Sequence, residues 1–124
     1  MFSIHQLLIF AARAGNVDLM RERIAAGADV SYYDQQHGSA LFAAIAGHHR
    51  SAIELLLSNG ADVQMADAYG HGPLECSLQL QDDNITSALL QSGARLKPHA
   101  LPHFRDALTE HLRRRASRHE PTTT

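Results

Sequence analysis

The chain has 124 residues, of which 44% are hydrophobic and 19% charged, with a formal net charge of −2 at pH 7. This length predicts one domain with its own hydrophobic core, and the single cysteine, Cys76, excludes an intramolecular disulfide and a zinc site of several cysteines. The charge is uneven, because residues 1–94 carry four basic and ten acidic side chains, whereas residues 95–124 carry seven basic and three acidic ones. The sequence therefore predicts an acidic body and a basic C-terminal segment.

The N-terminal region contains a short apolar run at residues 7–12, followed by Arg13. No basic residue precedes this run, and it is shorter than the core of a typical secretory signal. No apolar run reaches the roughly 18 residues that a membrane-spanning helix needs. We therefore expect a cytoplasmic protein with no membrane partner. Residues 4–14 are predicted to form a helix that Ser3 and Gln6 cap as a reciprocal pair.

Two short helices and a turn are predicted three times along the chain. The first helices are expected at residues 4–14, 40–47 and 73–81, and the second helices at 17–26, 50–59 and 84–92. A glycine follows each second helix, at positions 27, 60 and 93, where a left-handed conformation suits glycine. The stretches 28–39 and 61–72 are predicted as β-hairpin connections, and Asn84 or Asp83 as the N-cap of the last second helix.

These units are internal repeats with a step of 33 residues. The sequence GADV at residues 27–30 recurs at 60–63 and, as GARL, at 93–96. Comparison of residues 8–34 with 41–67 gives seven identities in 27 positions, and these include the repeated glycine, alanine and leucine positions. The second helix of the middle unit is apolar around most of its circumference, so only neighbours on both sides can cover it. The pattern predicts an α-solenoid.

The sequence resembles ankyrin repeats over residues 4–98. The resemblance is carried by SALFAA at 39–44, GPL at 72–74 and IELLLSNGADV at 53–63. It implies an all-α ankyrin-repeat solenoid in which residues 1–98 form three repeats, at about 1–33, 34–66 and 67–98. The chain departs from the family where His48 stands in place of a usual glycine and where QDDN at 81–84 replaces the usual Gly-His turn.

A C-terminal capping helix is predicted at residues 99–118, with a disordered tail at 119–124. Leu101, Phe104, Leu108 and Leu112 have helical spacing and are expected to form its apolar stripe. The arginines at 113–115 and 118 allow two interpretations. They are cations that stabilise the C-terminal end of a helix on a solvated surface, or they attract nucleic acid, an acidic partner surface or a basophilic kinase that acts on Ser117.

Candidate residues for chemistry are few. His48, His49, His99 and His103 are the best metal candidates, but no Asp, Glu or Cys completes either pair at ligand spacing. His49 matches a family position whose histidine hydrogen-bonds locally. Cys76 is expected to pack as a small apolar residue. We predict no catalytic residue, metal or cofactor and no enzymatic activity. The alternatives are a metal or redox protein that uses His48, His49 and Cys76, and nucleic-acid association through the arginine-rich helix.

The resemblance implies that the protein binds a partner protein through a concave face of hairpin tips and first helices. Carried over position by position, it nominates partner-binding residues, which are Arg13, Tyr33, Gln35, Gln36, Tyr69, His71, Gln79 and Leu80, with Gly38, Ala46, Gly47, Ala66 and Ala68 beside them. Tyr32 is expected to pack onto the stack. Asp29, Asp34, Asp62 and Asp67 are expected to steer a basic partner where they remain free. We expect a free-standing monomer that acts as a dedicated inhibitor or immunity-type protein.

Overall fold

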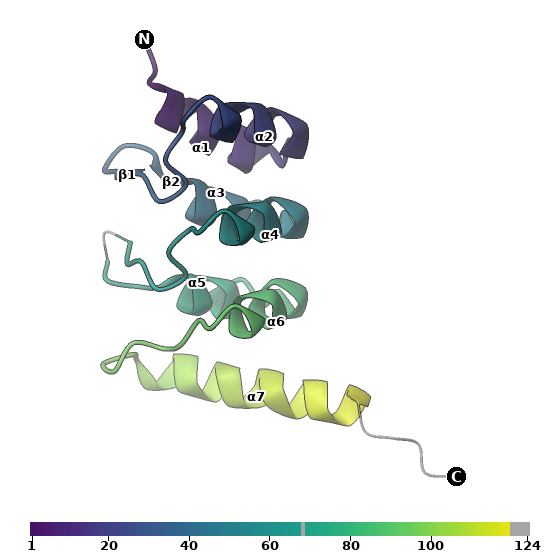
Figure 1. The fold of residues 1–124 in the computed structure, drawn as a ribbon. Helices are drawn as coiled ribbons and strands as arrows, with labels where there is room; N and C mark the ends of the chain where they lie inside the picture. The colour runs from purple at the N-terminus through teal and green to yellow at the C-terminus, as the bar shows by residue number, and fades with distance from the viewer. Residues whose placement is uncertain (68, 120–124) are drawn as a thin grey trace.

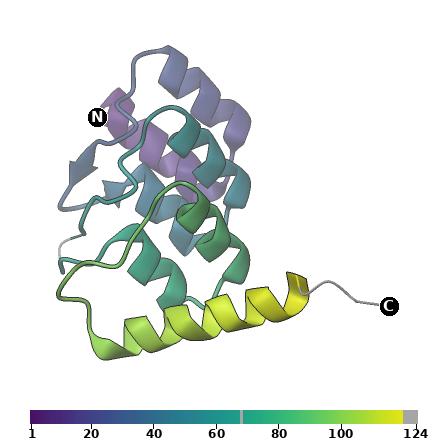
Figure 2. The ribbon, with the colours of Figure 1, turned by 60° about the horizontal axis from the view of Figure 1, so that its bottom comes forward.

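The computed structural model describes residues 1–67 and 69–119. Its elements in chain order are α1 (Ile4–Ala14), α2 (Val17–Ala25), β1 (Tyr33–Asp34), β2 (Gly38–Ser39), α3 (Ala40–Ala46), α4 (Arg50–Ser58), α5 (Pro73–Gln79), α6 (Asp83–Gln91) and α7 (Pro102–His119). Three pairs of short helices are stacked in a column, and α7 lies across its C-terminal end (Figures 1 and 2). This confirms the predicted helical solenoid.

The core runs the length of the column because successive units bury each other's apolar faces. The first helices pack on one another, α1 on α3 and α3 on α5, and the second helices do the same. Ala12 and Ala44 are fully buried and let the first helices approach closely. In α4, Ile53 and Leu56 are also fully buried. Units on both sides therefore cover the apolar circumference that one helix pair would leave exposed.

The turns between paired helices keep the 33-residue step. Gly15, His48 and Gln81 occupy equivalent positions and have φ angles of 71°, 58° and 58°. This position requires the left-handed conformation that glycine adopts at the lowest cost. His48 and Gln81 adopt it as well, so the departures from the family pattern leave the turn unchanged.

The helix termini follow from local capping. Ser3 and Gln6 form the predicted reciprocal cap of α1. The N-cap of α6 is Asp82, whose Oδ1 accepts the backbone N–H of Ile85 at 3.1 Å, so the prediction of Asn84 or Asp83 was wrong. Asp82 is 66 residues after Asn16, the cap of α2, and the third unit therefore keeps the spacing of the first.

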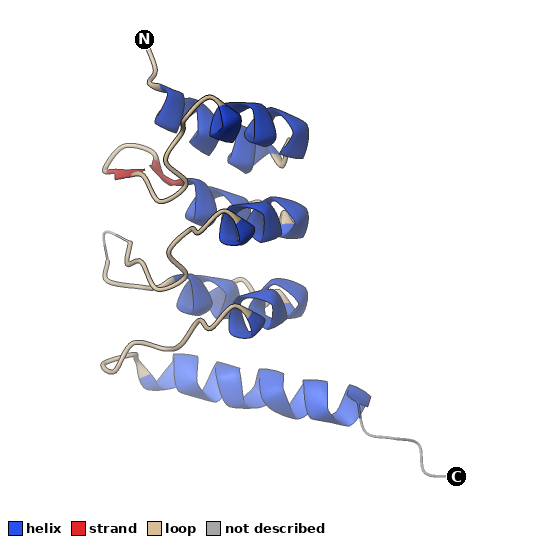
Figure 3. Ribbon diagram, in the orientation of Figure 1, coloured by secondary structure: helices blue, strands red, loops and turns tan. Residues whose placement is uncertain are grey.

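The two long connections differ. In the first, Tyr33 pairs with Ser39 and Asp34 with Gly38 in a short antiparallel hairpin (Figure 3). In the second, residues 61–67 and 69–72 include no strand, so the predicted hairpin is wrong for the described part of this segment. There Asp67 holds the turn instead, because its Oδ1 accepts the N–H groups of Tyr69 at 2.8 Å and His71 at 2.9 Å.

Hydrogen bonds between units also repeat. The N–H of Asp62 donates to Ser31 Oγ at 3.1 Å, and one unit later the N–H of Arg95 donates to Gln64 Oε1 at 2.6 Å. The N–H of Asp29 has no preceding unit in the described chain to bond with, and it donates to His5 Nδ1 at 2.9 Å. These bonds fix each connection against its neighbour.

The helix α7 closes the stack through a face that differs from the prediction. Phe104 is 2% exposed and His111 is 1% exposed, whereas Leu101 and Leu112 are 53% and 48% exposed. The predicted stripe through Leu101 and Leu112 is therefore wrong. His111 takes the buried place because α6 supplies polar partners for it. The helix also includes His119, the first residue of the predicted tail at 119–124, and residues 120–124 lie outside the described residues.

Candidate partner-binding groove

A groove of about 380 Å³ lies between the second and third helix pairs on the side of the hairpin. The hairpin and α3 supply one wall, and the next connection and α5 supply the other. The lining residues are Tyr33, Gly38, Phe42, Ile45, Ala46, Asp67, Tyr69, Cys76, Gln79 and Leu80. We call this site the inter-unit groove. Apart from Asp67 and Gln79, its walls are apolar or aromatic.

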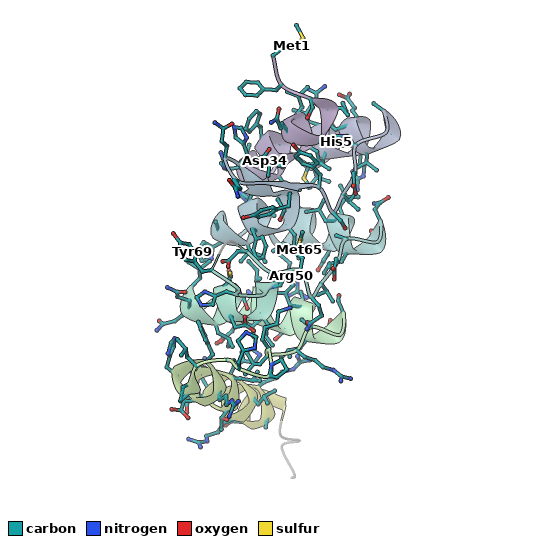
Figure 4. The ribbon with its side chains drawn as sticks, turned by 90° about the vertical axis from the view of Figure 1, so that its left-hand side faces the viewer. Met1, His5, Asp34, Arg50, Met65 and Tyr69 are labelled. Atoms are coloured by element: carbon teal, nitrogen blue, oxygen red, sulfur yellow. The ribbon has the colours of Figure 1, made fainter. Side chains whose placement is uncertain are left out.

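The inter-unit groove brings together four of the eight nominated partner-binding residues, which are Tyr33, Tyr69, Gln79 and Leu80. Tyr69 is 85% exposed and Leu80 is 39% exposed, so large apolar area remains open to solvent here. Figure 4 shows Tyr69 at the edge of the molecule, whereas Met65 of the same connection lies near its middle. The tyrosine therefore faces outward at the mouth of the groove.

The other four nominated residues lie elsewhere. Arg13 donates to the carbonyl oxygen of His37 at 3.4 Å, and Gln35 and Gln36 are exposed at the hairpin tip. His71 lines a neighbouring cavity of about 240 Å³ beneath the start of α7. Of the residues named beside them, Ala68 lies outside the described residues. The nominated set is thus spread along the face, with its centre at the inter-unit groove.

Four lining residues were not nominated from the sequence, namely Phe42, Ile45, Asp67 and Cys76. Helical spacing offered a signal for two of them. Phe42 lies four residues before Ala46, and Cys76 four residues before Leu80, so each shares a helix face with a nominated residue. Asp67 was considered only as a member of a repeating acidic set.

The repeating aspartates mostly serve the backbone. Asp29 and Asp62 each accept the N–H group two residues later at 2.9 Å. Asp34 accepts the N–H of His37 at 2.6 Å and also bonds three side chains. Desolvation would raise the pKa of Asp34, but the hydrogen bonds from His37, Gln6 and Tyr32 outweigh it and lower the pKa to about 2. These carboxylates are turn-forming groups first.

Tyr32 and Cys76 are both expected from the sequence to pack rather than to bind. Tyr32 packs against the core, as predicted, and its ring stacks on His5 with centroids 5.0 Å apart. Cys76 is half-buried. Burial, together with the charges of Asp67 and Glu75, raises the pKa of its thiol to about 12. The thiol is therefore neutral at neutral pH and is a poor nucleophile.

The histidine pair at the second turn links three units. His49 Nε2 lies 3.0 Å from the carbonyl oxygen of Arg13, and His48 Nδ1 lies 2.7 Å from Asp82 Oδ2. The bond of His49 reaches into the preceding unit, so the expectation of a local bond was wrong. Among residues 1–67 and 69–119, no three His, Cys, Asp or Glu side chains gather in a way that could hold a metal ion.

A polar cluster that the sequence did not indicate joins α6 to α7. His111 Nδ1 lies 3.0 Å from Asp83 Oδ1, and His111 Nε2 lies 3.3 Å from Ser87 Oγ. The hydrogen-bonded chain Ser87–His111–Asp83 has the same residue types as the Ser-His-Asp triad of a hydrolase. However, the adjacent cavity of about 400 Å³ is lined by Asp83 and not by Ser87 or His111. We interpret the cluster as a link between the two helices.

The basic cluster of α7 is partly neutralised. Arg114 donates to Asp83 at 2.9 Å, and Arg113 pairs with Glu110 at 3.2 Å. The hydrogen bonds of Arg114 and His111 lower the pKa of Asp83 to about 2. Arg115 follows in the helix, and the side chain of Arg118 lies outside the described residues. No helix in the described part of the chain is long and apolar enough to span a membrane.

The chain matches the family model "Ankyrin repeats (3 copies)" over residues 8–99. It is 33% identical to RelA-associated inhibitor of Mus musculus over 88 residues, which are 71% of this chain and 11% of that protein. It is 39% identical to human Arf-GAP with coiled-coil, ANK repeat and PH domain-containing protein 2 over 61 residues, 48% of this chain and 8% of that protein. It is 26% identical to L-asparaginase of Dirofilaria immitis over 91 residues, which are 73% and 15% of the two chains. The chain thus spans a small part of each relative.

Proposed function

Because the chain belongs to the ankyrin-repeat family, we propose that it binds a partner protein through the face made by the connections and the first helices, centred on the inter-unit groove. The observation that supports this most is the exposed apolar lining of that groove. Tyr69 and Leu80, which are 85% and 39% exposed, leave large apolar area open at its mouth. Exposed apolar area of this kind marks interaction sites.

The chemistry of the lining fits a protein ligand. Tyr33 and Tyr69 supply rigid surface with a polar end, and such aromatic anchors dominate binding energy in protein interfaces. Gln79 adds a side chain that donates and accepts hydrogen bonds at the rim. The proposed function is binding without catalysis, which agrees with the neutral thiol of Cys76.

Affinity purification tests this proposal. The wild-type chain and a Tyr33→Ala, Tyr69→Ala double variant are used as baits in extracts of the native source. We expect the wild type to retain a stoichiometric protein that the double variant loses, while both keep the same helical circular dichroism. Leu112→Ala is the matched control, because it removes an exposed apolar side chain outside the groove. Equal retention by all three baits would show that the partner binds another face.

Inhibition is the finer form of the proposal. The mouse relative is, by its name, an inhibitor associated with another protein, and its similarity to this chain lies in 11% of its length. We propose that this chain also inhibits the protein it binds, and that it does so in the cytoplasm. The activity of the captured partner, assayed with the wild type and with the double variant, tests the inhibition. If the activity of the partner is unchanged at a saturating concentration of the wild-type chain, the chain binds its partner but does not inhibit it.

A further inference from the structure

Asp34 and Asp67 occupy equivalent positions one repeat apart, but their carboxylates have different surroundings. Both accept backbone N–H groups of the turn that follows. Oδ2 of Asp34 also lies 3.2 Å from Gln6 Nε2, 3.2 Å from the hydroxyl of Tyr32 and 3.3 Å from His37 Nδ1. The second oxygen of Asp34 is therefore fully used inside the protein.

The three side chains that bond Asp34 are replaced around Asp67. One repeat later, the positions of Gln6, Tyr32 and His37 are held by Ser39, Met65 and Gly70. Of these, only Ser39 carries a side-chain donor. Its hydroxyl oxygen caps α3 by accepting the N–H of Phe42 at 3.2 Å, and it makes no hydrogen bond to Asp67 in the described part of the structure. The repeat thus keeps the aspartate and its turn but lacks the donors that satisfy its second oxygen.

The hydrogen bond that the second oxygen of Asp67, Oδ2, accepts is weak. Among the described residues, the thiol of Cys76 donates to Asp67 Oδ2 at a distance of 3.9 Å, and a thiol is a weak donor. Of the four repeating aspartates, Asp67 lines the inter-unit groove. A carboxylate oxygen with spare hydrogen-bonding capacity therefore lies in the wall of an otherwise apolar groove.

We propose that the inter-unit groove takes an arginine side chain of the partner, with the guanidinium on Asp67 Oδ2 and the methylene stem against the apolar walls. This inference rests on the proposed function and names the chemistry of the partner. An arginine matches both parts of the site, because it combines a long apolar stem with a charged planar head. A guanidinium also stacks on aromatic faces, which Phe42, Tyr33 and Tyr69 supply.

Charge supports a basic occupant. Residues 1–94 carry ten acidic and four basic side chains, so the body that contains the groove attracts a cationic segment. The arginine-rich end of α7 offers a competing occupant from a second copy of the chain. That arrangement would produce oligomers that depend on Asp67.

The test uses two small probes of nearly the same shape, of which one is charged and the other neutral. Nα-acetyl-arginine amide and Nα-acetyl-citrulline amide are titrated into the ¹⁵N-labelled protein and followed by amide chemical shifts. We expect the arginine probe to move the resonances of Tyr69, Gln79 and Leu80 at millimolar concentrations. The citrulline probe has nearly the same shape, but a neutral urea group with an acceptor oxygen replaces the guanidinium. It should bind about tenfold more weakly, as expected for loss of a charged hydrogen bond.

Two variants assign the effect to one carboxylate. Asp67→Asn should weaken the arginine probe about tenfold, because Asn keeps an oxygen for the turn but loses the charge. Asp62→Asn removes the same charge outside the groove and should leave the titration unchanged. Spectra of the free variants report whether each fold is intact. The comparison of probes on the wild type does not depend on either variant folding.

Several results would overturn the proposal. These are an absence of shifts at the groove, equal binding of the arginine and citrulline probes, or an Asp67→Asn variant that binds arginine normally. Binding of Nα-acetyl-lysine amide, titrated as a third probe, with the same affinity as the arginine probe would also overturn it. Sedimentation that shows Asp67-dependent oligomers would assign the groove to a second copy. If Asp67→Asn retains the captured partner while the Tyr33→Ala, Tyr69→Ala variant loses it, the arginine inference fails and the proposed function stands.

Discussion

At the residue scale, the structure is most sensitive at the turns that join paired helices. Gly15 has a φ of 71°, and a β-carbon placed there would lie 2.5 Å from His49 Nδ1. The same imidazole bonds to the carbonyl oxygen of Arg13 and therefore has little freedom to move away. One position thus combines a left-handed backbone with a close contact between units.

Gly15→Ala is expected to destabilise the protein by more than the backbone cost alone, which is about 1–2 kcal/mol. Urea unfolding followed by circular dichroism measures the change. Gly38→Ala is the matched control, because its φ is 72° but no atom lies within 4 Å of an added β-carbon. Equal losses of unfolding free energy in the two variants would show that the His49 side chain moves away at no energetic cost.

The Cys76 thiol provides a second test at this scale. Because burial and the nearby carboxylates raise its pKa to about 12, we expect very slow alkylation by iodoacetamide at pH 8. The same protein unfolded in urea should react about a thousandfold faster, since an ordinary thiol has a pKa near 8.5. A folded rate within a few fold of the unfolded rate would contradict the burial described for this side chain.

At the element scale, α7 buries one face against the last unit and leaves another in solvent. Phe104 and His111 lie on the buried face, and Leu112 is half exposed. The interior partners of His111 come from α6, where Asp83 and Ser87 lie four residues apart. A histidine thus closes the stack where the spacing of leucines predicted an apolar contact.

Truncation of α7 side chains should separate the two faces. Phe104→Ala is expected to cost about 3–5 kcal/mol, the usual loss for a buried phenylalanine. Leu112→Ala should change stability by about 0.5 kcal/mol or less, because its side chain is largely in solvent. Urea midpoints of both variants check this. A larger loss for Leu112→Ala would restore the stripe predicted from sequence.

Local chemistry explains what could be predicted at this scale. Caps such as Ser3 with Gln6 and the glycines after the second helices depend on residues close in the chain, and the 33-residue step is visible as a repetition of these local patterns. The structure confirms them. The burial of His111 depends on Asp83, which lies 28 residues away, and no period reports that pair. The groove could not be predicted either, because Tyr33 and Leu80 belong to different units and the sequence does not show that they line the same site.

At the scale of the whole molecule, two carboxylates couple stability to pH. Asp34 holds the first hairpin, and Asp83 joins α6 to α7, and both have a pKa lowered from 3.8 to about 2. A carboxylate with a lowered pKa in the folded state stabilises the fold fully above its unfolded pKa. That contribution is lost as the pH falls from about 4 to about 2, because the folded state must then take up protons.

The urea midpoint should therefore be constant near neutrality with respect to these two groups and fall steeply between about pH 4 and pH 2. Asp83→Asn should lower the midpoint at pH 6 and make the acid fall shallower. Arg21→Ala serves as the control, since Arg21 pairs with Asp18 on the exposed surface and such pairs contribute little. A steeper acid fall in Asp83→Asn would show that Asp83 is not a source of the acid sensitivity.

The two walls of the inter-unit groove belong to consecutive units, with Tyr33 and Phe42 on one side and Tyr69 and Leu80 on the other. The spacing between those walls is set by contacts outside the groove, such as the hydrogen bond from the N–H of Asp62 to Ser31. A partner that contacts both walls therefore restrains the movement of one unit relative to the next. Binding of the partner would make the stack of helix pairs more rigid, and the affinity would depend on the distance between the two repeats.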